Sequence, residues 1–246
     1  MKVYLDNNIL ISIEDGQINI KDLRSFFGDD VQFVYSYCHL LELLASNDRF
    51  ENLRKKRMDT IRFVTKMQHI SPDNDNDGQF IFERKDPEII LKIILENSLI
   101  FEQMKVNARM IEFDRERIIN ELSIDKRRLN NYSEDEVISR LDKSLSNRIG
   151  FGLIPLVDLT GQRLHEQICT IFNFLDHVGF WTDVHTEKSC IARVYDSSHA
   201  YFASGCDYFL SNDRKARMKS RVAYKFKKIH STIVCGWDNK QKKPVC

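Results

Sequence analysis

The 246-residue chain carries 37 basic and 36 acidic side chains, which gives a formal net charge of +1 with neutral histidines. This balance excludes a protein that coats nucleic acid through global charge, so any contact with nucleic acid must come from local patches. With 42% hydrophobic residues, 30% charged residues and only 9 Gly and 4 Pro, the composition predicts a globular protein and excludes a collagenous or Pro-rich chain.

The sequence gives no sign of a membrane segment or a leader. No apolar run approaches the ~20 residues that cross a bilayer, and Asp6 interrupts the start before a signal peptide could form. The six cysteines contain no Cys-x-x-Cys pair. We therefore expect a cytoplasmic protein with free thiols at Cys38, Cys169, Cys190, Cys206, Cys235 and Cys246.

The two ends of the chain alternate between strand and helix patterns. The expected N-terminal elements are a strand over Lys2–Leu5, a helix over Ile9–Glu14, a strand over Val31–Tyr35 and a helix over Tyr37–Ala45. The expected C-terminal elements are a helix over Glu187–Ser204, a strand over Asp207–Ser211, a basic helix over Arg214–Lys228 and a strand over Ser231–Cys235. Such alternation predicts an α/β fold with a mostly parallel sheet.

Residues 51–179 read differently, as mostly helical patterns interrupted by the Asp- and Asn-rich segment 71–78. We interpret this segment as a surface loop. The simplest organisation joins residues 1–50 and 180–246 in one α/β core and treats residues 51–179 as a helical insertion.

Four carboxylates occupy comparable positions in the expected core. They are Asp6, directly after the first strand, Glu42 and Asp196, on helices, and Asp213, directly after the 207–211 strand. In a parallel sheet these positions border one crevice, where four carboxylates would repel one another unless cations neutralise them. Hard oxygen ligands without a Cys or His cluster favour Mg²⁺ or Mn²⁺.

The segments that carry these acids resemble those of the PIN-domain nucleases. The resembling stretches are Val3–Asn8, Tyr35–Leu43, Asp196–Ala203 and Cys206–Asp213. The resemblance implies a three-layer α/β/α Rossmann-like fold and a catalytic metal site made of Asp6, Glu42, Asp196 and Asp213. It also implies that Ser211 lies beside the metal. Asn8 is a candidate to orient Asp6, and His39 and His199 could brace Glu42 and Asp196 or simply be buried.

The segment after Asp213 is strongly basic and is the candidate substrate-binding surface. Its residues Arg214, Lys215, Arg217, Lys219 and Arg221 suit sequence-independent contacts to phosphates. A second basic patch, Arg54–Arg57, is either a similar surface or a solvated helix face.

Together these features predict a Mg²⁺- or Mn²⁺-dependent endonuclease, with RNA favoured over DNA because the family tendency favours it. A toxin or defence ribonuclease is one form that this activity could take. An antitoxin-like protein or a second copy of the chain is a candidate partner. Two alternatives remain open, a non-catalytic PIN-like binding scaffold and a structure-specific DNA nuclease.

Overall fold

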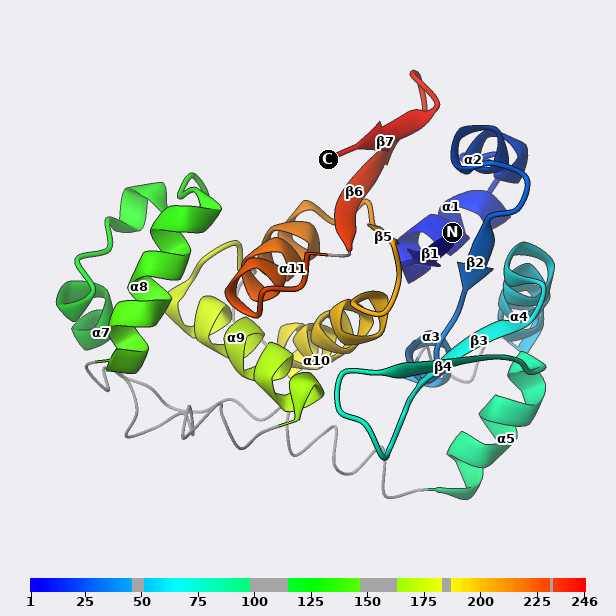
Figure 1. Cartoon of the computed structure of the whole chain (residues 1–246), viewed down its shortest axis with the longest axis horizontal. Coiled ribbons are helices and arrows are strands. Elements are labelled where there is room, and N and C mark those ends of the chain that lie inside the picture. Colours follow the sequence, from blue (N-terminus) through cyan, green and yellow to red (C-terminus); the bar gives the residue numbers. More distant parts are fainter. Residues whose placement is uncertain (46–50, 98–114, 147–162, 183–186, 231) are drawn as a thin grey trace.

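A computed structural model describes residues 1–45, 51–97, 115–146, 163–182, 187–230 and 232–246 (Figure 1). Its main sheet has five strands in the order β2-β1-β5-β6-β7. The strands are β1 (Lys2–Leu5), β2 (Gln32–Val34), β5 (Tyr208–Leu210), β6 (Ile233–Asp238) and β7 (Lys243–Val245). The first four are parallel to their neighbours, and β7 is antiparallel to β6. The sheet is therefore mostly parallel, as the sequence predicts.

From the two central strands, β1 and β5, the chain adds further strands in opposite directions. From β1 the chain moves outward to β2 on one side, and from β5 it moves outward to β6 on the other. The register pairs Leu5 with Leu210, so the carboxyl ends of β1 and β5 lie next to each other. This is the edge at which open α/β sheets place their binding crevice.

Side chains alternate between the two faces of the sheet, and those of each face pack into a separate hydrophobic core. Tyr4 and Phe209 point to one face, whereas Val3, Leu5 and Leu210 point to the other. The first core includes residues of α7 (Arg115–Glu121), α8 (Glu134–Ser146), α9 (Leu164–Val178), α10 (Glu187–Ala203) and α11 (Arg214–Phe226). The second includes residues of α1 (Asn7–Glu14), α2 (Ile20–Phe27), α4 (Glu51–Thr65) and α5 (Pro87–Glu96).

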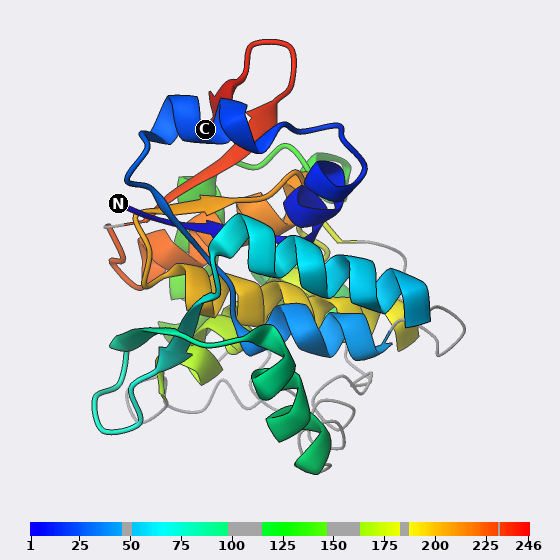
Figure 2. The ribbon, with the colours of Figure 1, turned by 90° about the vertical axis from the view of Figure 1, so that its right-hand side faces the viewer.

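Viewed from the side of α4 and α5, these two helices lie in front of the strands and α9–α11 lie behind (Figure 2). The arrangement is a mixed α/β fold compatible with three layers. Helix α3 (Tyr37–Ala45) contributes Cys38 to the first core and Leu40 and Leu41 to the second.

The N-terminal elements follow the prediction except for one missed helix. Asp6 caps α1, which begins at Asn7 rather than Ile9. The missed helix is α2, which has Asn19 as its N-cap and ends at Gly28, a glycine with a φ of 93°. Both signals are present in the sequence, and their spacing marks a helix of eight residues.

The middle of the chain contains a β-hairpin where helix was expected. Strands β3 (Gln68–Pro72) and β4 (Phe80–Arg84) pair in antiparallel fashion on either side of the Asp- and Asn-rich segment. That segment is therefore the turn of a hairpin and not a break between helices. Tyr35 forms an isolated parallel bridge with His69, which attaches the hairpin to the end of β2.

The C-terminal elements have shifted bounds and one additional strand. Strand β6 begins at Ile233 and continues to Asp238, while residue 231 of the predicted strand lies outside the described residues. Strand β7 pairs Val245 with Gly236, so Cys246 lies opposite Cys235 and forms a disulfide with it. This pairing contradicts the expectation of free thiols at these two positions.

None of the helices in the described parts of the chain combines the length and the apolar character needed to span a bilayer. The other described elements are the short 3₁₀ helix Lys126–Arg128 and the turns between the helices.

Candidate functional site

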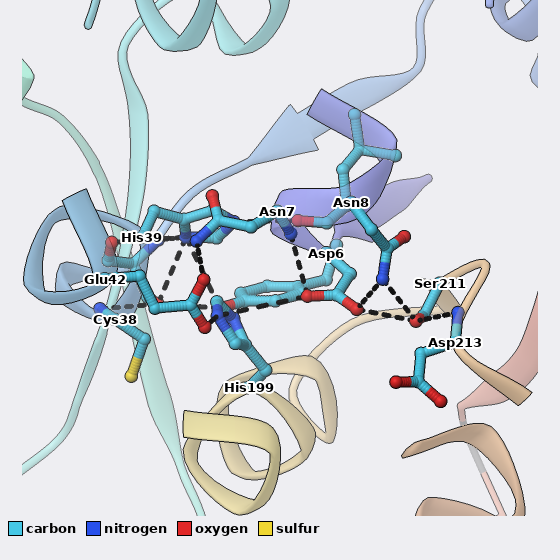
Figure 3. A network of polar contacts seen from close by, with 12 residues as sticks. Asp6, Asn7, Asn8, Cys38, His39, Glu42, His199, Ser211 and Asp213 are labelled. Carbon is cyan, nitrogen blue, oxygen red and sulfur yellow. Dashed lines mark hydrogen bonds and ion pairs between the residues drawn. The ribbon is translucent and has the colours of Figure 1, made fainter. Parts of the chain in front are cut away.

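The site lies where β1 and β5 end side by side, and Asp6 is at its centre (Figure 3). Asp6 is the first residue after β1, and its backbone N–H donates to the carbonyl of Leu210 in β5 (2.9 Å). Asp6 as a whole residue is 7% exposed. The carboxylate of Asp6, which follows the end of β1, therefore lies next to the end of β5.

Four contacts hold the Asp6 carboxylate in place. Oδ1 accepts from the backbone N–H of Asn7 (2.7 Å), as expected for an N-cap. Oδ2 accepts from Asn8 Nδ2 (2.5 Å) and from Ser211 Oγ (2.6 Å). The fourth contact is with His199, whose Nε2 lies 4.0 Å from Oδ1. Asn8 and Ser211 thus both donate to the Asp6 carboxylate, and the place of Ser211 beside a metal stays a prediction.

Glu42, on α3, joins the site through a contact with His199. His199 Nε2 lies 2.9 Å from Glu42 Oε1, and Asn7 Nδ2 donates to Oε2 (2.5 Å). Burial alone would raise the pKa of Glu42, but the contact with His199 outweighs it and lowers the pKa. Burial likewise opposes the charge of His199, and the neighbouring Glu42 and Asp6 raise its pKa above the ordinary value. The pair is therefore a part-buried contact in which each partner favours the charged form of the other.

The other nitrogen of His199 continues this contact into the core. Tyr4 Oη lies 2.7 Å from His199 Nδ1 and 2.7 Å from Ser36 Oγ. The imidazolium can donate to the tyrosine oxygen, whose own hydrogen then turns to Ser36. His39 is different: its Nε2 lies 2.7 Å from the carbonyl of Leu5, and burial lowers its pKa to about 3. His39 is thus a neutral buried histidine that supports the end of β1.

Asp196 and Asp213 complete the acidic group from α10 and from the end of β5. The pKa of Asp196 is raised well above its ordinary value by burial and by the negative charges of Asp6, Asp213 and Glu42, against the opposing effect of Lys219. Asp213 caps α11, where its Oδ1 accepts from the backbone N–H groups of Lys215 (2.7 Å) and Ala216 (3.1 Å). Asp6, Asp213 and Glu42 therefore lie near enough to Asp196 for their charges to raise its pKa.

The donors suit a hard divalent cation, although they are not arranged as a finished ligand set. The carboxylates repel one another, and the buried Asn7 Oδ1 has no hydrogen-bond partner. Both features favour a cation that accepts oxygen ligands. Among the described residues, however, no group of three His, Cys, Asp or Glu side chains is disposed to hold a metal ion.

The basic helix α11 differs from the predicted substrate-binding surface. Only Arg214 of the five predicted residues is exposed. Arg217 donates to the carbonyl of Ser211 (2.6 Å), and Arg221 donates to that of Val234 (2.8 Å). Lys215 is half-buried and donates to the carbonyl of Thr182 (3.4 Å). These basic side chains mostly support the backbone around the site.

Lys219 corrects the prediction most directly, because it is 5% exposed. It pairs with the buried Asp176 of α9, and Arg193 Nε of α10 lies 3.8 Å from the same carboxylate. A phosphate in solvent does not reach a side chain in this position. The physical reason is that α11 packs against α9 and α10, so one side of the basic helix faces inward.

The second basic patch is partly neutralised. Arg57 Nε lies 2.6 Å from Glu14 Oε2, and Lys56 lies 3.5 Å from Oε1 of the same carboxylate. This pairing favours the solvated helix face over a nucleic-acid surface.

Sequence reasoning missed two members of the site, Tyr4 and Asn7. Tyr4 lies in the middle of an apolar strand, where a tyrosine is read as core. Asn7 stands beside Asp6, where an amide residue is typical of a helix start. Neither residue carries a pattern that points to Glu42 or His199, which are distant in sequence.

The charge of His199 predicts a pH-dependent contribution to stability in a metal-chelating buffer. Because folding raises the pKa of this histidine, its contribution is full below about pH 6.5 and is lost as pH rises through the folded pKa. The His199→Gln variant should therefore be destabilised most near about pH 6, with the difference from wild type shrinking toward alkaline pH. Urea unfolding across this range measures the effect. The exposed His230→Gln is the control, and an equally shrinking difference there would contradict the assignment.

The buried cluster of Asp176, Lys219 and Arg193 predicts a large stability effect. Asp176→Asn removes the carboxylate and leaves two buried cations uncompensated, which should lower the free energy of unfolding by about 3–5 kcal/mol. Denaturant unfolding measures this loss. The control is Lys225→Met on α11, the helix of Lys219, because Lys225 pairs with the exposed Asp135 (2.7 Å) and should matter little. Similar losses in both variants would show that Lys219 is not held as described.

Comparisons of the chain with models of known protein families, with curated proteins and with solved structures each find no match. What the chain does must therefore be inferred from its own residues and their geometry.

Proposed function

We propose that the chain is a divalent-metal-dependent endonuclease that hydrolyses phosphodiester bonds, with RNA as the favoured substrate. The main support is the grouping of Asp6, Glu42, Asp196 and Asp213 at the point where the strand order reverses. Acids that repel one another at such a point are costly to keep unless they bind a cation. The PIN-like segments that carry them favour nucleic acid as the substrate.

The four carboxylates would hold the metal, and the remaining polar residues would keep them in place. Asn8 and Ser211 fix the orientation of Asp6 through two hydrogen bonds to one oxygen. His199 and Asn7 fix Glu42 in the same way through one contact to each of its oxygens. A bound Mg²⁺ or Mn²⁺ supplies activation of a water molecule and stabilisation of charge on the scissile phosphate.

Substrate contacts would come from the exposed start of α11. Arg214 follows Asp213 directly and is exposed, so its charge lies within reach of a phosphate near the acidic site. Arg217 supports the same edge from behind through the carbonyl of Ser211. The preference for RNA rests on the family resemblance alone.

A second candidate function is a PIN-like binding scaffold without catalysis. It is favoured by one observation, the lack of a three-residue metal-ligand group among the described residues. The two functions differ in whether metal addition produces cleavage.

Replacing single carboxylates in the full chain tests the proposal. Asp6→Asn and Asp213→Asn should each lower cleavage of labelled single-stranded RNA at least about a hundredfold, because each removes a charged metal ligand. Asparagine also accepts hydrogen bonds at helix N-caps, so both helices keep their caps. Gel analysis with Mn²⁺ or with EDTA, on RNA and on DNA, measures the activity and its substrate class.

The matched control is Asp207→Asn. Asp207 lies just before β5, at the end of that strand opposite to Asp213. Asp207 is exposed and accepts from the backbone N–H of Lys2 (2.6 Å), a bond that asparagine can also accept. This variant should cleave like the wild type. Full activity in both site variants would refute the assigned site, and metal-independent binding without cleavage would favour the scaffold.

A further inference from the structure

A second cluster of reactive side chains lies between α9 and α10 and contains none of the four carboxylates. Cys169 Sγ lies 3.6 Å from His165 Nε2, one helical turn earlier on α9. It also lies 3.3 Å from Ser197 Oγ on α10. A thiol, an imidazole and a hydroxyl thus meet in one place, which is the arrangement that activates a cysteine.

The hydroxyl of Ser197 can stabilise a negative charge on the sulfur. Its oxygen lies 3.0 Å from the carbonyl of Val194 as well as 3.3 Å from the sulfur, so its one hydrogen can turn to either acceptor. The imidazole of His165 is held by the ring of Tyr201, with a centroid distance of 4.9 Å. His165 Nε2 also lies 3.4 Å from Ser198 Oγ. The polar partners of the sulfur are therefore fixed before any reagent arrives.

The electrostatics of the pair favour its charged form. Burial by itself would raise the pKa of Cys169, but His165 and Ser197 outweigh it and lower the pKa below the ordinary value. Burial opposes the charge of His165 in turn, and Cys169 together with Glu166 raises its pKa. The other titratable groups that face the thiol or border the adjoining cavity are Tyr37, Cys38, Asp73, Asp75, Asp77, Arg163 and Tyr201.

A cavity of about 280 Å³ borders the His165 side of this pair. It is lined by His165, Tyr37, Tyr201 and Arg163 and by acids of the β3–β4 turn. Cys169 lies one helical turn after His165 on α9 and is half-buried. The other described free cysteines, Cys38 and Cys206, are buried, and burial raises the pKa of both thiols. Cys169 is thus set apart from them by both its partners and its access.

We propose that Cys169 is a reactive thiolate, paired with His165, and that it is a modification site for hydroperoxides and small electrophiles. With a peroxide, the sulfur attacks one oxygen, an S–O bond forms and the O–O bond breaks. The departing hydroxide takes the proton of the His165 imidazolium and leaves as water. The sulfur loses two electrons and becomes a sulfenic acid, while the peroxide is reduced. This chemistry does not depend on the proposed nuclease activity.

Peptide-resolved mass spectrometry on the folded full chain tests the proposal. At about pH 6.5, iodoacetamide should alkylate Cys169 at least about tenfold faster than Cys206, because only the thiolate reacts. Hydrogen peroxide followed by dimedone should label Cys169 in the same order of preference. A rate for Cys169 no greater than that for Cys206 would overturn the proposal.

Two variants test the role of His165. His165→Gln should lower the alkylation rate of Cys169 near pH 6.5 about tenfold and move the pH midpoint of that reaction upward. His230→Gln, at an exposed site, should change neither. An unchanged pH profile in His165→Gln would refute the ion pair. If Cys206 becomes reactive in His165→Gln, that variant has lost its fold, and Ser197→Ala is tested instead. Ser197→Ala should lower the alkylation rate of Cys169 several-fold, and an unchanged rate would refute the proposal.

Discussion

The burial of Asp6 at the end of the central strand is the constraint on which the rest of the site depends. Burial raises the pKa of this carboxyl, and Glu42 adds to the effect by repulsion. The chain opposes both with donors from three places: the first turn of α1, the end of β5 and α10. A charge that needs partners from such distant segments also ties those segments together.

Glu42 and Asp6 favour the charged form of His199, because they raise its pKa against the effect of burial. The imidazole ring lies between Glu42 and Asp6 and contacts Tyr4 through its other nitrogen. The histidine thus does inside the protein part of what a metal ion would do at the same carboxylates, since it lowers the repulsion between them. This accounts for a compact acidic site in which the carboxylates already have partners although no three of the described ligand-type side chains form a metal-ligand group.

The sequence predicted the parallel sheet and the place of the acids because both follow from local signals. Asp6 follows β1 directly, Asp213 follows the end of β5 after Ser211 and Asn212, and each caps the next helix. The hairpin β3–β4 was missed because its turn reads equally well as a break between helices. The burial of Lys219 could not be predicted from the sequence. Its partner Asp176 and the neighbouring Arg193 lie on other helices, and no residue pattern near Lys219 indicates these contacts.

The inward-facing charges of α11 explain how a strongly basic helix fits a chain of net charge +1. Lys219 lowers the pKa of Asp196 while it pairs with Asp176, so one ammonium group acts on the acidic site and on the helix packing together. Arg217 holds the carbonyl of Ser211, whose hydroxyl donates to Asp6. Lys219 and Arg217 therefore contribute to the electrostatics and the hydrogen bonding of the site itself and do not form a free basic surface. Among the five predicted substrate contacts, Arg214 alone is exposed and can contact a substrate.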